Sequence, residues 1–134
     1  MVIDTNVLAH AAFGAGAIKA EALAVLGFVD VISAPDSLHA ELAQTAWRMC
    51  RVAGLDPEAA ASGLAVATRL VAHCVSTASL SEEAFLLALR VGHAAYDTLF
   101  VVLAQRLGTK LVTYDERVLA LFPDVAVHPS QLLG

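Results

Sequence analysis

Short apolar runs alternate along the chain with longer segments of helical periodicity. The runs have the length of buried strands and lie at residues 1–4, 29–33, 71–76, 110–113 and 125–128. Helical patterns between them cover residues 18–28, 36–53, 57–71, 81–94 and 97–107. This alternation is typical of a parallel sheet covered on both faces by helices. The sequence therefore predicts a single α/β domain over residues 1–134, with α/β/α layers and a central, mainly parallel, five-stranded sheet.

The composition is that of a folded domain with a substantial core. Hydrophobic residues make up 58% of the 134 residues and charged residues 16%, which excludes a disordered chain. The longest uncharged stretch, from Thr5 to Ile18, is shorter than the roughly 20 apolar residues of a membrane span. No basic segment precedes the first apolar run, so no secretory signal is expected. We interpret Cys50 and Cys74 as buried thiols, which favours a cytoplasmic location.

The net charge of −5 disfavours a large nonspecific nucleic-acid surface, because such surfaces are basic. If four of the acids gather at one metal site, however, the remaining surface carries a charge of only −1. A nucleic-acid substrate is therefore compatible with the sequence, provided that the contacts to its phosphates are few and local.

Four acids that are far apart in the sequence are expected at one edge of the sheet. Asp4 ends the first strand, and Asp115 follows the strand at 110–113. Asp97 begins a helix that is apolar nearly all round and leads into that same strand, while Glu41 lies in the first two turns of the helix after the second strand. Ligands of open parallel sheets bind beyond the carboxyl ends of the strands, where the strand order reverses. We therefore predict that the four carboxylates meet there.

Such a cluster needs a cation. Two carboxylates about 4 Å apart repel by about 4 kcal/mol at an effective dielectric constant near 20. Neither Asp4 nor Asp97 has a Lys or Arg nearby in the sequence. Divalent ions with carboxylate and water ligands, Mg²⁺ or Mn²⁺, are therefore predicted at this site. A pair of such ions can activate a water and stabilise the leaving oxygen in phosphodiester cleavage.

Four segments together resemble a PIN-domain ribonuclease of the VapC toxin type. They are VIDTNVL, PDSLHAELA, AAYDTLFVVLAQRLG and LVTYDERVL, which occur in the family's order within residues 2–120. The resemblance implies a PIN-like fold and an Mg²⁺- or Mn²⁺-dependent endoribonuclease, the toxin of a type II toxin–antitoxin pair. It also implies an RNA substrate, a small antitoxin protein as partner and a homodimer.

The family's acid quartet carries over to four residues of this chain, which the resemblance implies are catalytic and metal-binding: Asp4, Glu41, Asp97 and Asp115. Asn6 fits the small polar residue that relatives have two positions after the first acid. Thr113 matches the small hydroxyl residue that is usual before the last acid. One departure is Gln44, because many relatives have Asn there, one turn after the helix glutamate.

Each acid also has a purely structural interpretation. Asp4 can be a polar strand end, and Asp97 and Asp115 can cap helices. Glu41 flanks the expected buried side of its helix by about 60°, so it can point into a groove or into water. Glu116 is expected at the surface, with auxiliary metal ligation as the alternative.

Two basic side chains near the acids are open to a similar choice. His93 lies four residues before Asp97, so a hydrogen bond between them can orient the carboxylate. The alternative for His93 is a helix-terminal residue with another local partner. Arg48 lies on the same helix flank as Glu41, two turns on, where it is either an ordinary surface residue or a contact for a substrate phosphate.

Trp47 is unusual for a helix that covers a sheet. On a helical wheel it lies opposite the expected buried stripe, which contains Leu38, Leu42, Thr45, Met49 and Val52. Tryptophan is enriched where partners bury a surface. We therefore predict that Trp47 lies in a protein interface, with the antitoxin favoured over a second copy. The alternative is that the helix at 18–28 covers Trp47 within one chain.

Two other classes of function compete with the nuclease. The first is a noncatalytic interaction module on the same fold, which the intact acid quartet disfavours. The second is aspartyl phosphotransfer. A dehalogenase-like phosphatase needs an aspartate where this chain has Asn6, and a receiver domain needs an aspartate after the third strand, where Thr77 and Ser79 stand. The sequence does not indicate which RNA is cut.

Overall fold

The computed structural model describes residues 1–134 as a five-stranded sheet flanked by helices. All neighbouring strands are parallel, in the order β3-β2-β1-β4-β5. The predicted fold class is therefore confirmed. The strands are β1 (Val2–Ile3), β2 (Ser33–Pro35), β3 (His73–Val75), β4 (Leu111–Val112) and β5 (Ala126–Val127).

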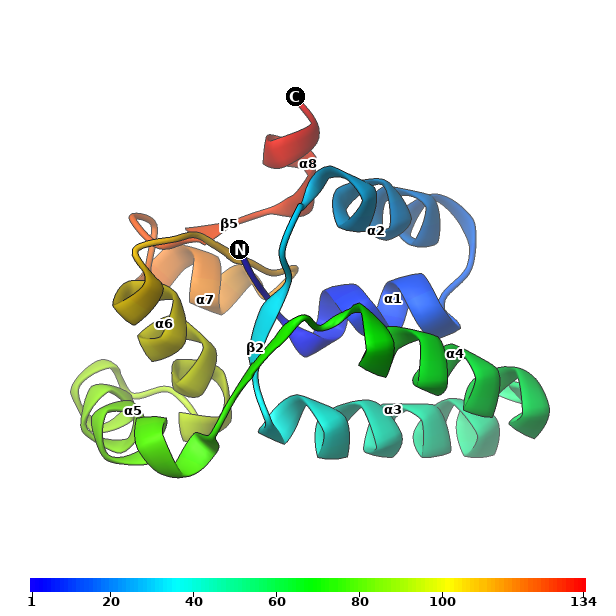
Figure 1. Ribbon diagram of the computed structural model, residues 1–134, viewed down its shortest axis with the longest axis horizontal. Helices are drawn as coiled ribbons and strands as arrows, with labels where there is room; N and C mark the ends of the chain where they lie inside the picture. The colour runs from blue at the N-terminus through cyan, green and yellow to red at the C-terminus, as the bar shows by residue number, and fades with distance from the viewer.

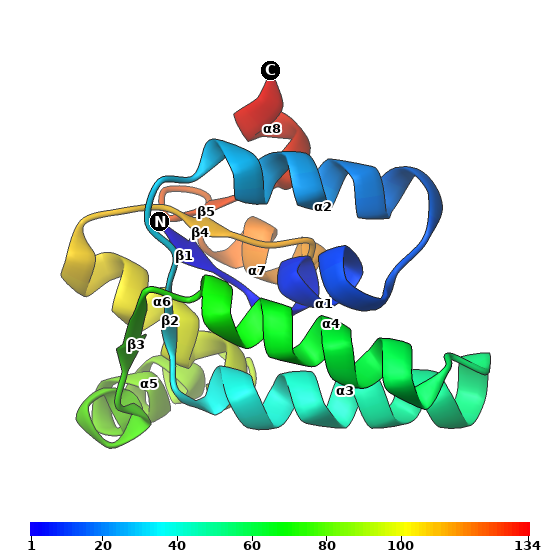
Figure 2. The ribbon, with the colours of Figure 1, turned by 45° about the vertical axis from the view of Figure 1, so that its right-hand side comes forward.

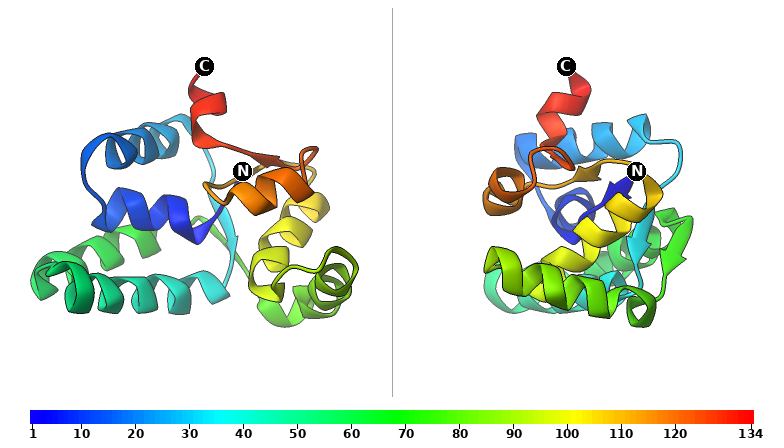
Figure 3. Two further views of the ribbon diagram at one scale, coloured as in Figure 1. Left: turned by 180° about the vertical axis from the view of Figure 1, so that it is seen from behind. Right: turned by 90° about the vertical axis from the view of Figure 1, so that its left-hand side faces the viewer.

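Eight helices connect and cover the strands. They are α1 (Thr5–Phe13), α2 (Gly16–Phe28), α3 (Ser37–Ala53), α4 (Pro57–Leu70), α5 (Thr77–Val91), α6 (Ala95–Leu107), α7 (Glu116–Leu121) and α8 (Pro129–Leu133). Figure 1 shows α1–α4 on one side of the strands and α5–α7 on the other. Figure 3 shows α8 at the same end of the molecule as α2, away from α3 and α5. No single helix is long and apolar enough to cross a membrane, although two bent helix pairs pass on length and composition.

Helix α6 is the central packing element. Every residue from Thr98 to Ala104 is buried. The helix contacts β1, β2 and β4, and α5 packs along it, as Figure 2 allows the reader to follow. An almost entirely apolar helix is stable in water only when it is covered on several sides. The first turn of α6, which holds Asp97, is thereby fixed relative to the carboxyl ends of the strands.

Several boundaries differ from those predicted. Helix α1 was not predicted, because its nine residues show no clear polar face, and α8 was missed as well. Strand β2 begins four residues later than expected and ends two residues later, on Pro35, whose missing N–H is tolerated at a strand end. Helix α5 begins at Thr77, so Ser81 lies inside it rather than at its start. Cys74 is exposed and Cys50 half-buried, which corrects the expectation of two buried thiols.

Candidate metal centre

The reversal of strand order places the ends of β1 and β4 side by side. From β1 the chain proceeds to β2 and β3 on one side, and later returns to β4 on the other. Asp4 directly follows β1, and Thr113 directly follows β4. Since β1 and β4 pair in parallel, with Ile3 opposite Val112, these two residues leave the sheet next to each other. The site thus forms at the strand-order reversal, where parallel sheets bind ligands.

The hydroxyl of Thr113 holds Asp4 in place. It donates to Asp4 Oδ2 at 2.7 Å and accepts from the Asp115 N–H at 2.9 Å and from Asn6 Nδ2 at 3.2 Å. Because both other neighbours are N–H donors, the only hydroxyl hydrogen goes to Asp4. Asn6 Nδ2 also donates to Asp4 Oδ2 at 3.3 Å, and Asn6 Oδ1 accepts from the Tyr114 N–H. Thr113 therefore connects the first acid to the backbone of the last.

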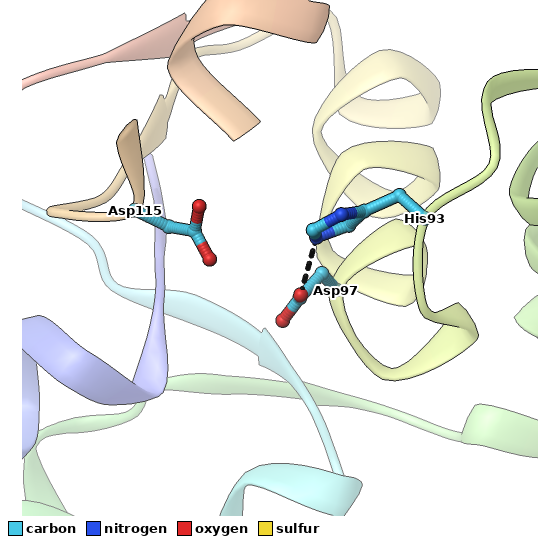
Figure 4. A group of neighbouring side chains, drawn as sticks. All are labelled: His93, Asp97 and Asp115. Carbon is cyan, nitrogen blue, oxygen red and sulfur yellow. Dashed lines mark hydrogen bonds and ion pairs between the residues drawn. The ribbon is translucent and has the colours of Figure 1, made fainter. Parts of the chain in front are cut away.

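Asp97 and Asp115 approach each other together with His93. One potential ligand atom from each of the three side chains lies within 4.8 Å of the others. Figure 4 shows their polar ends facing a common space, with His93 Nε2 and Asp97 Oδ2 hydrogen-bonded at 2.6 Å. Asp115 Oδ1 accepts from the N–H groups of Arg117 and Val118 at the start of α7. Asp115 thus caps a helix and also faces the other two side chains.

Glu41 reaches the site from α3 and is held by a residue of α1. The Thr5 hydroxyl donates to Glu41 Oε2 at 2.9 Å. A cleft of about 740 Å³ beside the sheet edge is lined by Asp4, Glu41 and Asp97 but not by Asp115. The four acids therefore form two overlapping groups, Asp4 with Glu41 and Asp97, and Asp97 with Asp115. Asp97 is the member common to both.

The electrostatics of the site are those of crowded, buried carboxylates. The pKa of Asp4 is raised to about 7, mainly by burial and also by the charges of Asp97 and Glu41, while the hydrogen bond from Thr113 opposes the shift. Burial also raises the pKa of Glu41, where the Thr5 hydrogen bond opposes the shift and the charge of Asp97 adds to it. The chain has two ion pairs, Asp97 with His93 and Arg106 with Glu83, so no Lys or Arg neutralises this group.

Comparison with known proteins decides the family. The PIN domain matches residues 1–126. The chain belongs to the PIN-domain family, which is a family of nucleases. The crystal structure of PAE2754 from Pyrobaculum aerophilum superposes with a TM-score of 0.78 at 20% sequence identity, over 98% of this chain and 85% of that one. At this identity the likeness shows a shared fold. A search of curated proteins finds no matching sequence.

The residues of this PIN domain fit a hard divalent cation. The ligand set consists of carboxylate oxygens with a single imidazole, and it lacks the thiolates that select soft metals. The Asp4 carboxyl is buried and has a raised pKa, and no Lys or Arg forms an ion pair with it. Asp4, Asp97 and Asp115, with Glu41, are the residues that would hold such an ion.

The remaining predicted site residues are spread around the PIN-domain cleft. Arg48 is exposed and lines it, together with Gln44. Glu116 is exposed in the first turn of α7 and is neither among the cleft residues nor in the group of Figure 4. Sequence reasoning missed Thr5 altogether and favoured another partner for His93. The signal for His93 was present, since it and Asp97 are separated by one helical turn in sequence.

Proposed function

We propose that this protein is an Mg²⁺- or Mn²⁺-dependent endoribonuclease that hydrolyses RNA phosphodiester bonds. The observation that carries the proposal is the buried Asp4, whose pKa is raised to about 7 at the strand-order reversal of a PIN domain, beside two further acids and without an ion pair to Lys or Arg. We assign metal binding to Asp4, Asp97, Asp115 and Glu41. The chemistry that such ions supply when bound is activation of water and stabilisation of the leaving oxygen.

The chain's own residues supply the geometry for this reaction. Thr113 and Asn6 hold the Asp4 carboxylate, and Thr5 holds Glu41, so both acids are oriented before any ligand arrives. Preorganised ligands avoid the cost of ordering side chains during binding. Thr113 also accepts from the backbone N–H of Asp115, which ties the position of the last acid to that of the first.

The cleft provides contacts for an RNA strand outside the acid group. Arg48 lines the cleft and can hold a phosphate, and the exposed ring of Tyr96, next to Asp97, can stack on a base. Few other basic residues lie along the cleft, so the expected contacts to phosphates are local. This matches what a net charge of −5 permits.

We further propose that the nuclease is the cytoplasmic toxin of a type II toxin–antitoxin pair, binds a small antitoxin and forms a homodimer. Its support is the resemblance of the four sequence segments to the VapC type, together with large apolar side chains that are exposed on α3 and α5. Trp47 on α3 is 57% exposed, and Phe85, Leu86 and Leu89 on α5 are exposed as well. Protein partners commonly cover such side chains.

Cleavage of structured RNA by the purified protein tests the nuclease proposal. The wild type is compared with Asp97→Asn and with Asp30→Asn, an exposed acid far from the site, in Mg²⁺, in Mn²⁺ and in chelator. We expect cleavage only with metal, its loss in Asp97→Asn and its retention in Asp30→Asn. Cleavage by Asp97→Asn at the wild-type rate would refute the site. A folded wild type that neither binds Mg²⁺ or Mn²⁺ nor cleaves RNA would favour the noncatalytic module.

A further inference from the structure

The group in Figure 4 contains a nitrogen donor that the acid quartet does not include. The His93 side chain is only 11% exposed, and its Nε2 faces Asp97 rather than solvent. Its donor atom lies within 4.8 Å of those of Asp97 and Asp115. Three potential ligands from three different segments, the α5–α6 turn, α6 and the start of α7, therefore converge on one point.

We propose that His93 is itself a ligand of the divalent ion held by Asp97 and Asp115, and that its nitrogen makes this site prefer Mn²⁺ over Mg²⁺. The inference rests on the proposed metal dependence and adds to it a residue and a metal preference.

The backbone holds His93 in the required position. Gly92, at φ +67°, ends α5 in the left-handed conformation, and the His93 N–H bonds back to the Ala88 carbonyl at 3.2 Å. The Arg117 guanidinium donates to the Gly92 carbonyl at 3.0 Å, while the Arg117 N–H donates to Asp115. One residue of α7 thus connects the turn that carries His93 to the acid opposite.

The spacing of the donors is close to what one ion requires. An octahedral ion with ligands at about 2.1 Å places neighbouring donors roughly 3 Å apart and opposite ones roughly 4.2 Å apart. His93 Nε2 and Asp97 Oδ2 are now 2.6 Å apart with one hydrogen between them, and the whole group spans 4.8 Å at most. Shifts of about half an ångström, with the imidazole hydrogen on Nδ1, let an ion take the place of that shared hydrogen.

Asp115 leaves room for such a nitrogen ligand. The two N–H groups at the start of α7 engage its Oδ1, so Oδ2 is the oxygen that remains for an ion. A bidentate grip by Asp115 would require breaking the helix cap. The imidazole therefore supplies a donor that the two acids do not provide.

The donor type predicts the metal preference. Mg²⁺ takes oxygen ligands almost exclusively and keeps several waters, whereas first-row transition ions accept imidazole readily. If His93 only oriented Asp97 through a hydrogen bond, its loss would weaken Mn²⁺ and Mg²⁺ binding alike. The two possible roles of His93, metal ligand or orienting partner of Asp97, are thus distinguished by how much its loss weakens Mn²⁺ binding relative to Mg²⁺ binding.

Pulsed electron paramagnetic resonance on the Mn²⁺-loaded full chain tests the assignment directly, because it detects a nitrogen bonded to Mn²⁺. We expect a ¹⁴N coupling in the wild type, its loss in His93→Gln and its retention in His10→Gln, a histidine that lines the adjacent cleft. Loss of an outer-shell partner alone costs about 10–100-fold in metal affinity. We therefore expect His93→Gln to weaken Mn²⁺ binding by at least about tenfold, and Mg²⁺ binding, measured by competition, by clearly less.

Bound Mn²⁺ without nitrogen coupling in the wild type would overturn the inference, whether or not the variants fold. So would equal losses of Mn²⁺ and Mg²⁺ affinity in a folded His93→Gln. Either result leaves the nuclease proposal intact if the wild type still cleaves RNA. Conversely, nitrogen coupling in a protein that cleaves no RNA would sustain the metal site and refute the nuclease.

Discussion

Replacing Asp4 by Asn is expected to stabilise the metal-free protein at neutral and alkaline pH. Asp4 is buried, and its ionised form is opposed by desolvation and by the charges of Asp97 and Glu41. Asn has nearly the same shape, and its carbonyl oxygen can still accept the hydrogen bond from Thr113. The substitution therefore removes a buried charge while leaving the packing and the acceptor in place.

The size and the pH dependence follow from the shifted pKa. The pKa rises from 3.8 in the unfolded chain to about 7 in the native protein, so the native state binds more protons between these values. The contribution of Asp4 to stability is then most favourable below pH 3.8 and declines until the pH exceeds about 7. A shift of about 3 units corresponds to ~4 kcal/mol at 1.36 kcal/mol per unit. Asp4→Asn should thus gain ~2–4 kcal/mol at pH 8 in chelator and almost nothing near pH 4.

Urea unfolding of wild type and Asp4→Asn in chelator, at several values between pH 4 and pH 8, measures this difference. Asp30→Asn provides the control, because Asp30 is exposed and its substitution should leave a flat difference. An Asp4→Asn protein that is less stable than the wild type at pH 8, or a gain that is the same at pH 4, would refute the electrostatic reasoning.

Two further predictions concern ligands and partners. Millimolar Mg²⁺ or Mn²⁺ should raise the melting temperature of the wild type, since an ion at 100 times its Kd adds about 2.7 kcal/mol to native-state stability; unchanged melting of a folded protein would contradict metal binding. Trp47→Ala should weaken antitoxin binding or dimerisation by about 2 kcal/mol, measured by calorimetry and sedimentation, with little change in monomer stability. If it instead unfolded the monomer and spared association, Trp47 would be a core residue.

The convergence of the acids could be predicted because it depends on topology alone. Parallel strands expose their carboxyl ends at one edge, so an acid after β1 and one after β4 meet if these strands are neighbours. The position of Asp97 at this edge could be predicted as well, because the short connection between α6 and β4 returns the start of α6 to the carboxyl end of β4. The division into two overlapping groups could not be predicted, because it depends on where α3 and α7 place Glu41 and Asp115 in three dimensions.

Features that depend on packing were predicted less well. The helical wheel correctly identified Leu38 and Leu42 as buried and Trp47 as exposed. It also extended the buried stripe to Val52, which is 82% exposed, whereas Ala46 is buried instead. Near its end α3 no longer faces enough of the domain to be covered, and periodicity does not report where a neighbouring element stops. Because Trp47 is exposed, the alternative that α2 covers it within one chain is wrong.

Two aspartates at the same edge of the sheet show what separates a structural acid from a functional one. Asp36 follows β2 as Asp4 follows β1, and the sequence gives them equivalent positions. Asp36 is exposed, and a hydrogen bond from the Thr77 N–H at 2.9 Å holds its pKa below the ordinary value. The fold therefore stabilises the charge of Asp36 and opposes that of Asp4, although both carboxylates accept hydrogen bonds. An acid that is oriented by its neighbours but not neutralised by them lowers stability until a cation binds, and that difference is why we assign metal binding to Asp4 and not to Asp36.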